Sequence, residues 1–108
     1  MIKIFASQYN GEAYVLSATG HAGGERNEQD HDLVCCAVST LMGTLANSCA
    51  QLQEVKTIYR QTSGDALLRV KKVPADMREE VAIRFRMALD GLQGLAQQYP
   101  ECLRVTEE

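Results

Sequence analysis

The segment DLVCCAVSTLMGTLANSCAQL, residues 32–52, has no charged residue after Asp32, and Gln53 extends the uncharged run by one position. Apolar side chains recur in it at helical spacing, at Val34, Val38, Leu41, Leu45, Cys49 and Leu52. This period predicts a helix over residues 33–52. Asp32 is the expected N-cap, because its carboxylate can accept a free amide of the first turn. We expect so apolar a helix to lie between a sheet and a second helix, or to be covered by a second subunit.

The same uncharged run is long enough to raise the possibility of a membrane span. It carries seven polar side chains, however, which are too many for a helix facing lipid: Ser39, Thr40, Thr44, Asn47, Ser48, Gln51 and Gln53. A helix buried in protein is the favoured interpretation, and no membrane partner is expected.

Strand patterns precede and follow this helix. Residues 1–7 (MIKIFAS) alternate apolar and polar side chains, and residues 12–18 (EAYVLSA) are rich in strand formers. Asn10-Gly11 between them predicts a β-hairpin, because both residues tolerate positive φ. After the helix, VKTIYRQ and ALLRVKK flank TSGD at residues 62–65, which predicts a second hairpin.

Pro74 and Asp76 predict the start of a second helix. Its expected buried stripe is Val81, Phe85, Ala88, Leu92 and Leu95. Pro100 should end it, and CLRV at residues 102–105 can add a short last strand. The order ββαββα(β) predicts an α+β fold, with an antiparallel sheet from two β-hairpins and two long helices.

Composition limits the function classes. The 108 residues are 45% hydrophobic and 23% charged, which predicts one folded domain over residues 1–108. A formal net charge of -3 argues against a nucleic-acid binder and suits a basic partner instead. Two of the four cysteines are adjacent and no signal-peptide pattern opens the chain, so we expect a cytoplasmic protein with reduced thiols.

The candidate catalytic residues lie just before and at the start of the predicted long helix. Both histidines of the chain, His21 and His31, lie within residues 19–32, and Cys35 and Cys36 follow directly. In the first turn of a helix capped by Asp32, Cys35 would meet free amides and a helix dipole that favour its thiolate. The glycine-containing loop after His21 could fold that imidazole over the thiol, where it would serve as general base and acid.

Other roles for these residues stay open. Cysteine also packs as a small hydrophobe, which is the favoured role for Cys49 and Cys102 and an even alternative for Cys36. Ser39 is first a helix-packing hydroxyl and second a substrate-site group, and His31 is favoured as a solvated loop residue. A metal site of histidine and cysteine ligands is possible on ligand type. Because no CxxC pair is present, we expect no metal and no other cofactor.

The motifs GHA (residues 20–22) and DLVCCAVS (residues 32–39) resemble the ribosomal-processing cysteine protease Prp family. Its members carry Gly-His-Ala and Asp-aliphatic-Val-Cys-Ala-(Ala/Gly)-x-Ser motifs, and the order of elements is similar over nearly the whole chain. The resemblance implies a cytoplasmic, homodimeric endopeptidase. Such enzymes remove a short N-terminal extension from a bacterial large-subunit ribosomal protein, the one numbered twenty-seven. The catalytic pair would be Cys35 and His21, with Asp32 at the motif aspartate.

Three departures from the family pattern are visible. Cys36 stands where alanine is usual, the loop between His21 and Cys35 is about two residues longer, and Asp30 replaces a common glycine. The register from Asp32 selects Cys35 over Cys36 as nucleophile. The backbone amides of Cys35 and Cys36 are the expected oxyanion donors. Two other classes are kept as alternatives: a non-catalytic module that binds a ribosomal protein, and a thiol redox or metal module.

Overall fold

The computed structural model of the chain describes residues 1–21 and 28–108, with the backbone alone for residues 28–32. Its elements follow in the order β1 (Ile2–Tyr9), β2 (Ala13–Thr19), α1 (Glu28–Ala50), β3 (Lys56–Thr62), β4 (Asp65–Lys71), the short 3-10 helix η1 (Ala75–Met77), α2 (Arg78–Gln98) and β5 (Leu103–Glu107). The predicted α+β class and the order ββαββαβ are confirmed, including the short last strand.

The strands form one sheet in the order β3-β4-β2-β1-β5. The two hairpins pair antiparallel as predicted, and β4 pairs antiparallel with β2. The fifth strand adds a parallel edge, since Ile2 pairs with Leu103 and Ala6 with Glu107. The sheet is therefore mixed, because α2 carries the chain back along the sheet before β5 joins β1 in the same direction.

The opening turn has the predicted geometry. Asn10 and Gly11 have φ values of 51° and 71°, and the Glu12 amide donates to the Tyr9 carbonyl at 2.8 Å. Residues with positive φ at both central positions match the right-handed twist of the flanking strands. This turn sets the register of β1 on β2.

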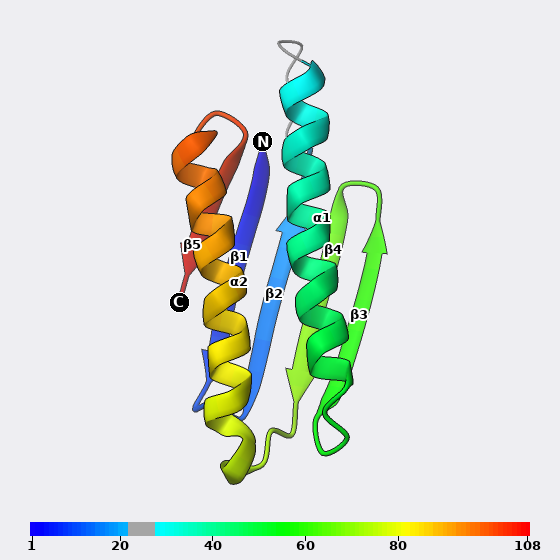
Figure 1. The fold of residues 1–108 in the computed structure, drawn as a ribbon, viewed down its shortest axis with the longest axis vertical. Helices are drawn as coiled ribbons and strands as arrows, with labels where there is room; N and C mark the ends of the chain where they lie inside the picture. The colour runs from blue at the N-terminus through cyan, green and yellow to red at the C-terminus, as the bar shows by residue number, and fades with distance from the viewer. Residues whose placement is uncertain (22–27) are drawn as a thin grey trace.

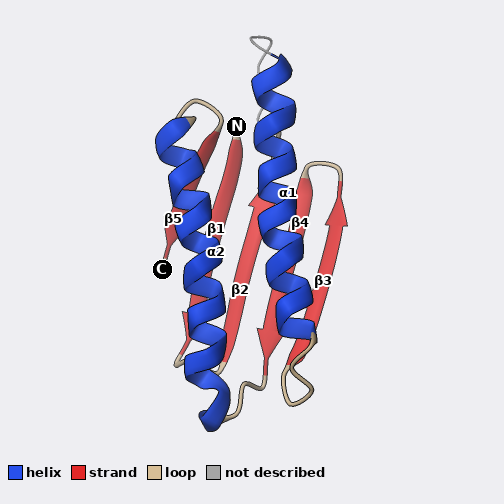
Figure 2. Cartoon of the chain, in the orientation of Figure 1, coloured by secondary structure: helices blue, strands red, loops and turns tan. Residues whose placement is uncertain are grey.

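Both helices lie side by side on one face of the sheet, α1 toward β3 and β4 and α2 toward β1 and β5 (Figures 1 and 2). Of the two places expected for α1, the one between the sheet and α2 is therefore wrong, and cover by a second subunit stays a prediction. The core between the two layers includes Ile4 and Leu16 from the strands, Met42 from α1 and Phe85 from α2. The Phe85 ring stacks on Tyr14 with centroids 4.5 Å apart. Cys49 and Cys102 are buried in the core, as predicted.

Helix α1 begins at Glu28, several residues before the predicted start. Asp32 lies inside the helix and is not its N-cap, so that prediction is wrong. The upper end of α1 extends beyond the end of the sheet (Figure 1). Its sequence there need not carry apolar residues at helical spacing, because no sheet lies beneath it. The polar residues 28–32 therefore look like a loop in the sequence although they continue the helix.

Within α1, residues Leu33–Ala50 are long and apolar enough, by length and composition, to cross a membrane. Core packing accounts for part of this apolar character. One side of the segment supplies core residues: Val34, Val38, Met42, Leu45, Ala46 and Cys49. The other side, with Leu33, Cys36 and Thr44, is exposed in the single chain and carries no charge.

Candidate active site

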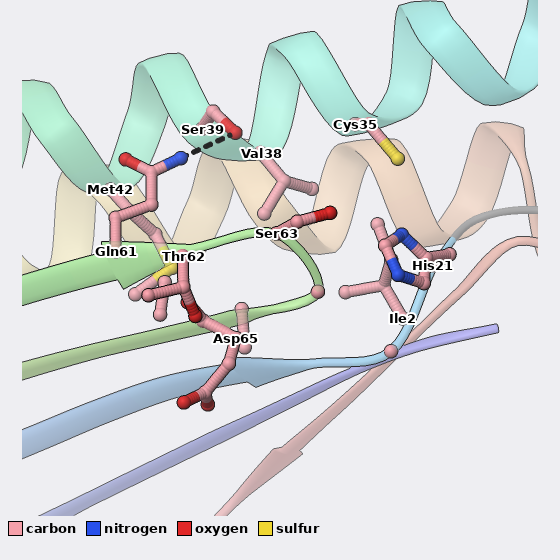
Figure 3. A pocket seen from close by; sticks show the side chains of 14 residues that line it. Ile2, His21, Cys35, Val38, Ser39, Met42, Gln61, Thr62, Ser63 and Asp65 are labelled. Atoms are coloured by element: carbon pink, nitrogen blue, oxygen red, sulfur yellow. Dashed lines mark hydrogen bonds between the residues drawn. The ribbon is translucent and has the colours of Figure 1, made fainter.

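An open cavity of about 220 Å³ lies between α1 and the end of the sheet that carries the β3–β4 turn (Figure 3). Apolar side chains from β1, β2, β4 and α1 line it: Ile2, Ala18, Ala66, Val38 and Met42. Uncharged polar side chains line it as well: Ser39 from α1, Gln61 and Thr62 from β3, and Ser63 from the turn. A cavity of this size and character can hold part of an extended peptide.

Cys35 and His21 both line this cavity. Cys35 is half-buried on α1, and His21 follows the end of β2. Figure 3 shows the Cys35 sulfur above the His21 ring, at the same end of the cavity. Among the described residues no hydrogen bond joins the two side chains, and such contacts commonly tighten only when substrate is bound. The structure thus brings together the two residues that the sequence paired.

The other cysteines lie elsewhere. Cys36 is exposed and does not line the cavity, so it is not a core-packing residue. All four thiols are free. Burial raises the pKa of the Cys49 thiol, and the nearby Arg84 guanidinium offsets only part of that effect. Burial therefore favours the protonated thiol of Cys49.

The early start of α1 changes the expected electrostatics of Cys35. The thiol lies well inside the helix and not in its first turn, where amides are free. The backbone amides of Cys35 and Cys36 face carbonyls of the preceding turn, so they are not available as oxyanion donors. That prediction is wrong for the same reason as the cap. The glycine-containing part of the loop (residues 22–27) and the side chains of Asp32 and His31 lie outside the described residues.

A chain of hydrogen bonds reaches the cavity from β3. The Tyr59 hydroxyl donates to Gln61 Oε1 at 2.9 Å. Gln61 Nε2 in turn donates to Ser39 Oγ at 3.0 Å (Figure 3). Burial raises the pKa of Tyr59, which keeps its phenol a proton donor at neutral pH. Ser39 is exposed at the cavity and does not pack between helices. The geometry favours the substrate-site role that the sequence placed second.

Gln61 is a site residue that sequence reasoning missed. In the sequence it is one polar residue at the end of a strand, and nothing local relates it to Ser39. The cavity is weakly charged near Cys35, since the Asp65 carboxylate points away from both Cys35 and His21 (Figure 3). Among the residues whose side chains the structure describes, 1–21 and 33–108, no cluster of three or more metal-ligating side chains occurs.

A thiol and an imidazole at one end of a cavity are the groups that a cysteine hydrolase uses. Residues 1–104 match the model of the family described as cysteine protease Prp, and the chain belongs to that family. It is therefore a cysteine protease. A comparison with curated proteins finds no match.

Solved structures support the same fold. The essential ribosomal processing protease Prp from Staphylococcus aureus, in complex with a covalently linked product peptide, matches with a TM-score of 0.78 and 21% identity over 100% of both chains. The same protease with a substrate peptide matches with a TM-score of 0.76 and 19% identity over 100% of both chains. SMU.848 from Streptococcus mutans is 27% identical, with a TM-score of 0.71 over 99% of this chain and 93% of that one.

Proposed function

We propose that this protease removes a short N-terminal extension from a bacterial large-subunit ribosomal protein, the one numbered twenty-seven, with Cys35 as nucleophile and His21 as general base. The observation that carries the proposal is that Cys35 and His21, from α1 and the end of β2, line one cavity large enough for a peptide segment. The ribosomal processing protease from S. aureus, which has the same fold, has been crystallised with a covalently linked product peptide.

The reaction follows from these two side chains. Cys35 Sγ attacks the scissile carbonyl carbon while His21 accepts the thiol proton. The resulting tetrahedral oxyanion collapses, the C–N bond breaks, and His21 gives the proton to the departing amine. A thioester remains on Cys35. Water, deprotonated by His21, then attacks that thioester and releases the carboxylate product and the free thiol.

Ser39 is the proposed donor to the oxyanion in place of the helix amides. It lies one helical turn from Cys35, on the same side of α1. Its Oγ accepts a hydrogen bond from Gln61, so its own proton is free to donate into the cavity. The side chain of Asp32, at the motif aspartate, is proposed to orient or charge-stabilise His21.

Charge and surface features support the proposed partner and assembly. The formal net charge of -3 suits a highly basic ribosomal protein as substrate. The uncharged outer face of α1, with Leu33 59% exposed, supports a homodimer in which a second copy covers it. Four free cysteines suit the reducing cytoplasm, where we place the enzyme.

The nucleophile is tested with the two adjacent cysteines as a matched pair. Cys35→Ala should abolish cleavage of an extended substrate peptide while leaving folding and peptide binding nearly unchanged, because the change is small. Cys36→Ala should retain activity. Cleavage is followed by mass spectrometry and folding by circular dichroism. Activity lost in Cys36→Ala and kept in Cys35→Ala would move the nucleophile by one position.

The base is tested in the same assay with the two histidines. His21→Ala should eliminate turnover and slow alkylation of Cys35, because it removes the group that accepts the thiol proton. His31→Ala is the matched control and should change rates only modestly. An inactive His31 variant beside an active His21 variant would show that the pairing is incorrect.

The two alternative classes of protein predict different experimental results. A non-catalytic module would bind the extended ribosomal protein without shortening it. A redox or metal module would show stoichiometric metal or a reversible disulfide in the purified protein. The N-terminus of that ribosomal protein in the same genome should carry an extension, and its absence would contradict the proposed substrate.

A further inference from the structure

His21 is held at the site by the β3–β4 turn. The last rung between β2 and β4 pairs Thr19 with Asp65, and the Gly20 amide then donates to the Gly64 carbonyl at 2.9 Å. The residue before His21 is thereby tied to the turn that closes the second hairpin. Figure 3 shows the His21 ring beside this turn, at the end marked by Ser63, with Cys35 above it.

The ring occupies space that a side chain at position 64 would fill. A Cβ added to Gly64 would lie 2.6 Å from His21 Nε2 and 3.0 Å from Cε1. Atoms do not approach so closely, and the atoms involved belong to the imidazole ring itself, so the ring would have to move. Gly64 also has a φ of +76°, which glycine adopts without steric cost.

We infer that Gly64 is a positioning residue for the histidine of this protease. This role rests on the proposed function of His21. By lacking a side chain, Gly64 lets the imidazole lie against the β3–β4 turn within reach of Cys35. A base displaced by about 1 Å can lose roughly 10²-fold in rate, because proton transfer depends steeply on geometry.

The test uses a matched pair of glycines with the same backbone conformation. Gly11 in the β1–β2 turn has a φ of +71°, and the nearest atoms to a Cβ there belong to the flexible Arg78 side chain, at 3.4 Å and beyond. Asparagine tolerates positive φ but has a Cβ. Gly64→Asn and Gly11→Asn therefore carry a similar backbone cost and differ in what their Cβ meets.

We expect Gly64→Asn to lower kcat for an extended peptide by about 10-fold or more, with a smaller change in KM, while Gly11→Asn keeps wild-type kcat. Iodoacetamide labelling supplies a second readout. Gly64→Asn should slow labelling of Cys35 but not of its exposed neighbour Cys36, a selectivity that partial unfolding would not produce. Gly64→Ala adds the Cβ alone and replaces Gly64→Asn if the larger side chain prevents folding.

Wild-type kcat and wild-type Cys35 labelling in a folded Gly64 variant would overturn the positioning role. Equal losses in the Gly64 and Gly11 variants would overturn it too, because backbone strain would then explain both. These results are separate from a failure of the proposed function itself. That failure would appear as full cleavage activity in His21→Ala.

Discussion

Cys35 and Cys36 are chemically identical neighbours in the sequence, yet they face different surroundings. Cys35 points toward the cavity that holds His21, whereas Cys36 lies on the exposed side of α1. Cys49 and Cys102 are buried in the core. The chain therefore contains a candidate nucleophile (Cys35), an exposed reference thiol (Cys36) and two buried thiols. All four can be compared within a single experiment.

At neutral pH we expect iodoacetamide to label Cys35 about 10-fold faster than Cys36, because the His21 imidazole beside it can accept the thiol proton as the sulfur attacks. Cys49 should react slowest, since burial both shields its thiol and raises its pKa. Peptide mass spectrometry at timed intervals measures all four rates in the folded protein. Equal labelling of Cys35 and Cys49 would contradict the assignment of the nucleophile.

At the scale of the element, β5 is an edge strand tied to α2 by one ion-pair cluster. Arg86 donates to both carboxylate oxygens of Glu107, at 3.0 and 3.2 Å, and Gln93 donates to the same carboxylate at 3.2 Å. The Arg86 hydrogen bonds, followed by that of Gln93, lower the pKa of Glu107. The stabilisation is thus present above the ordinary glutamate pKa and is lost as pH falls through the lowered value.

Glu107→Gln should lower the free energy of unfolding at pH 7 by about 0.5 kcal/mol, a small effect because the pair is largely exposed. The difference from wild type should shrink as pH falls below the ordinary glutamate range, and it should vanish once Glu107 is protonated in the folded chain. Urea unfolding at several pH values measures it. Glu101→Gln, an exposed glutamate just before β5, is the control. A pH-independent difference would mean that the ion pair is not its cause.

At the scale of the whole molecule, one helix face is left without a partner. The exposed side of α1 is uncharged from Leu33 to Ala50, and the single chain leaves Leu33 and Thr44 open to solvent. We proposed above that a second copy of the chain covers this face. The homodimer proposal therefore makes a prediction about mass.

Light scattering should give twice the 11.9 kDa of one chain. Thr44→Glu places a charge on the exposed face of α1 and should shift the equilibrium toward the monomer, because the charge would be buried without a partner. Thr106→Glu makes the same change at an exposed position of β5 and should leave the dimer intact. A wild-type monomer, or a dimer broken only by Thr106→Glu, would contradict this interface.

The sequence by itself determined the order of the elements, both hairpin turns and the pairing of Cys35 with His21. The alternation of β1, the helical period of α1 and the positive φ expected at Asn10-Gly11 are local properties. They arise from steric preferences within a few residues, so a pattern can reveal them. The candidate pair could be proposed from the sequence because its motifs, GHA and DLVCCAVS, are also short and local.

Only the tertiary structure decided that β5 runs parallel to β1, that α1 begins at Glu28, and that Gln61 reaches Ser39. It alone brought Gly64 against the ring of His21. Each of these depends on contacts between segments far apart in the chain, or on a helix end that extends beyond the sheet and needs no apolar period. No local spacing encodes such contacts, because they exist only after the helix layer has packed on the sheet.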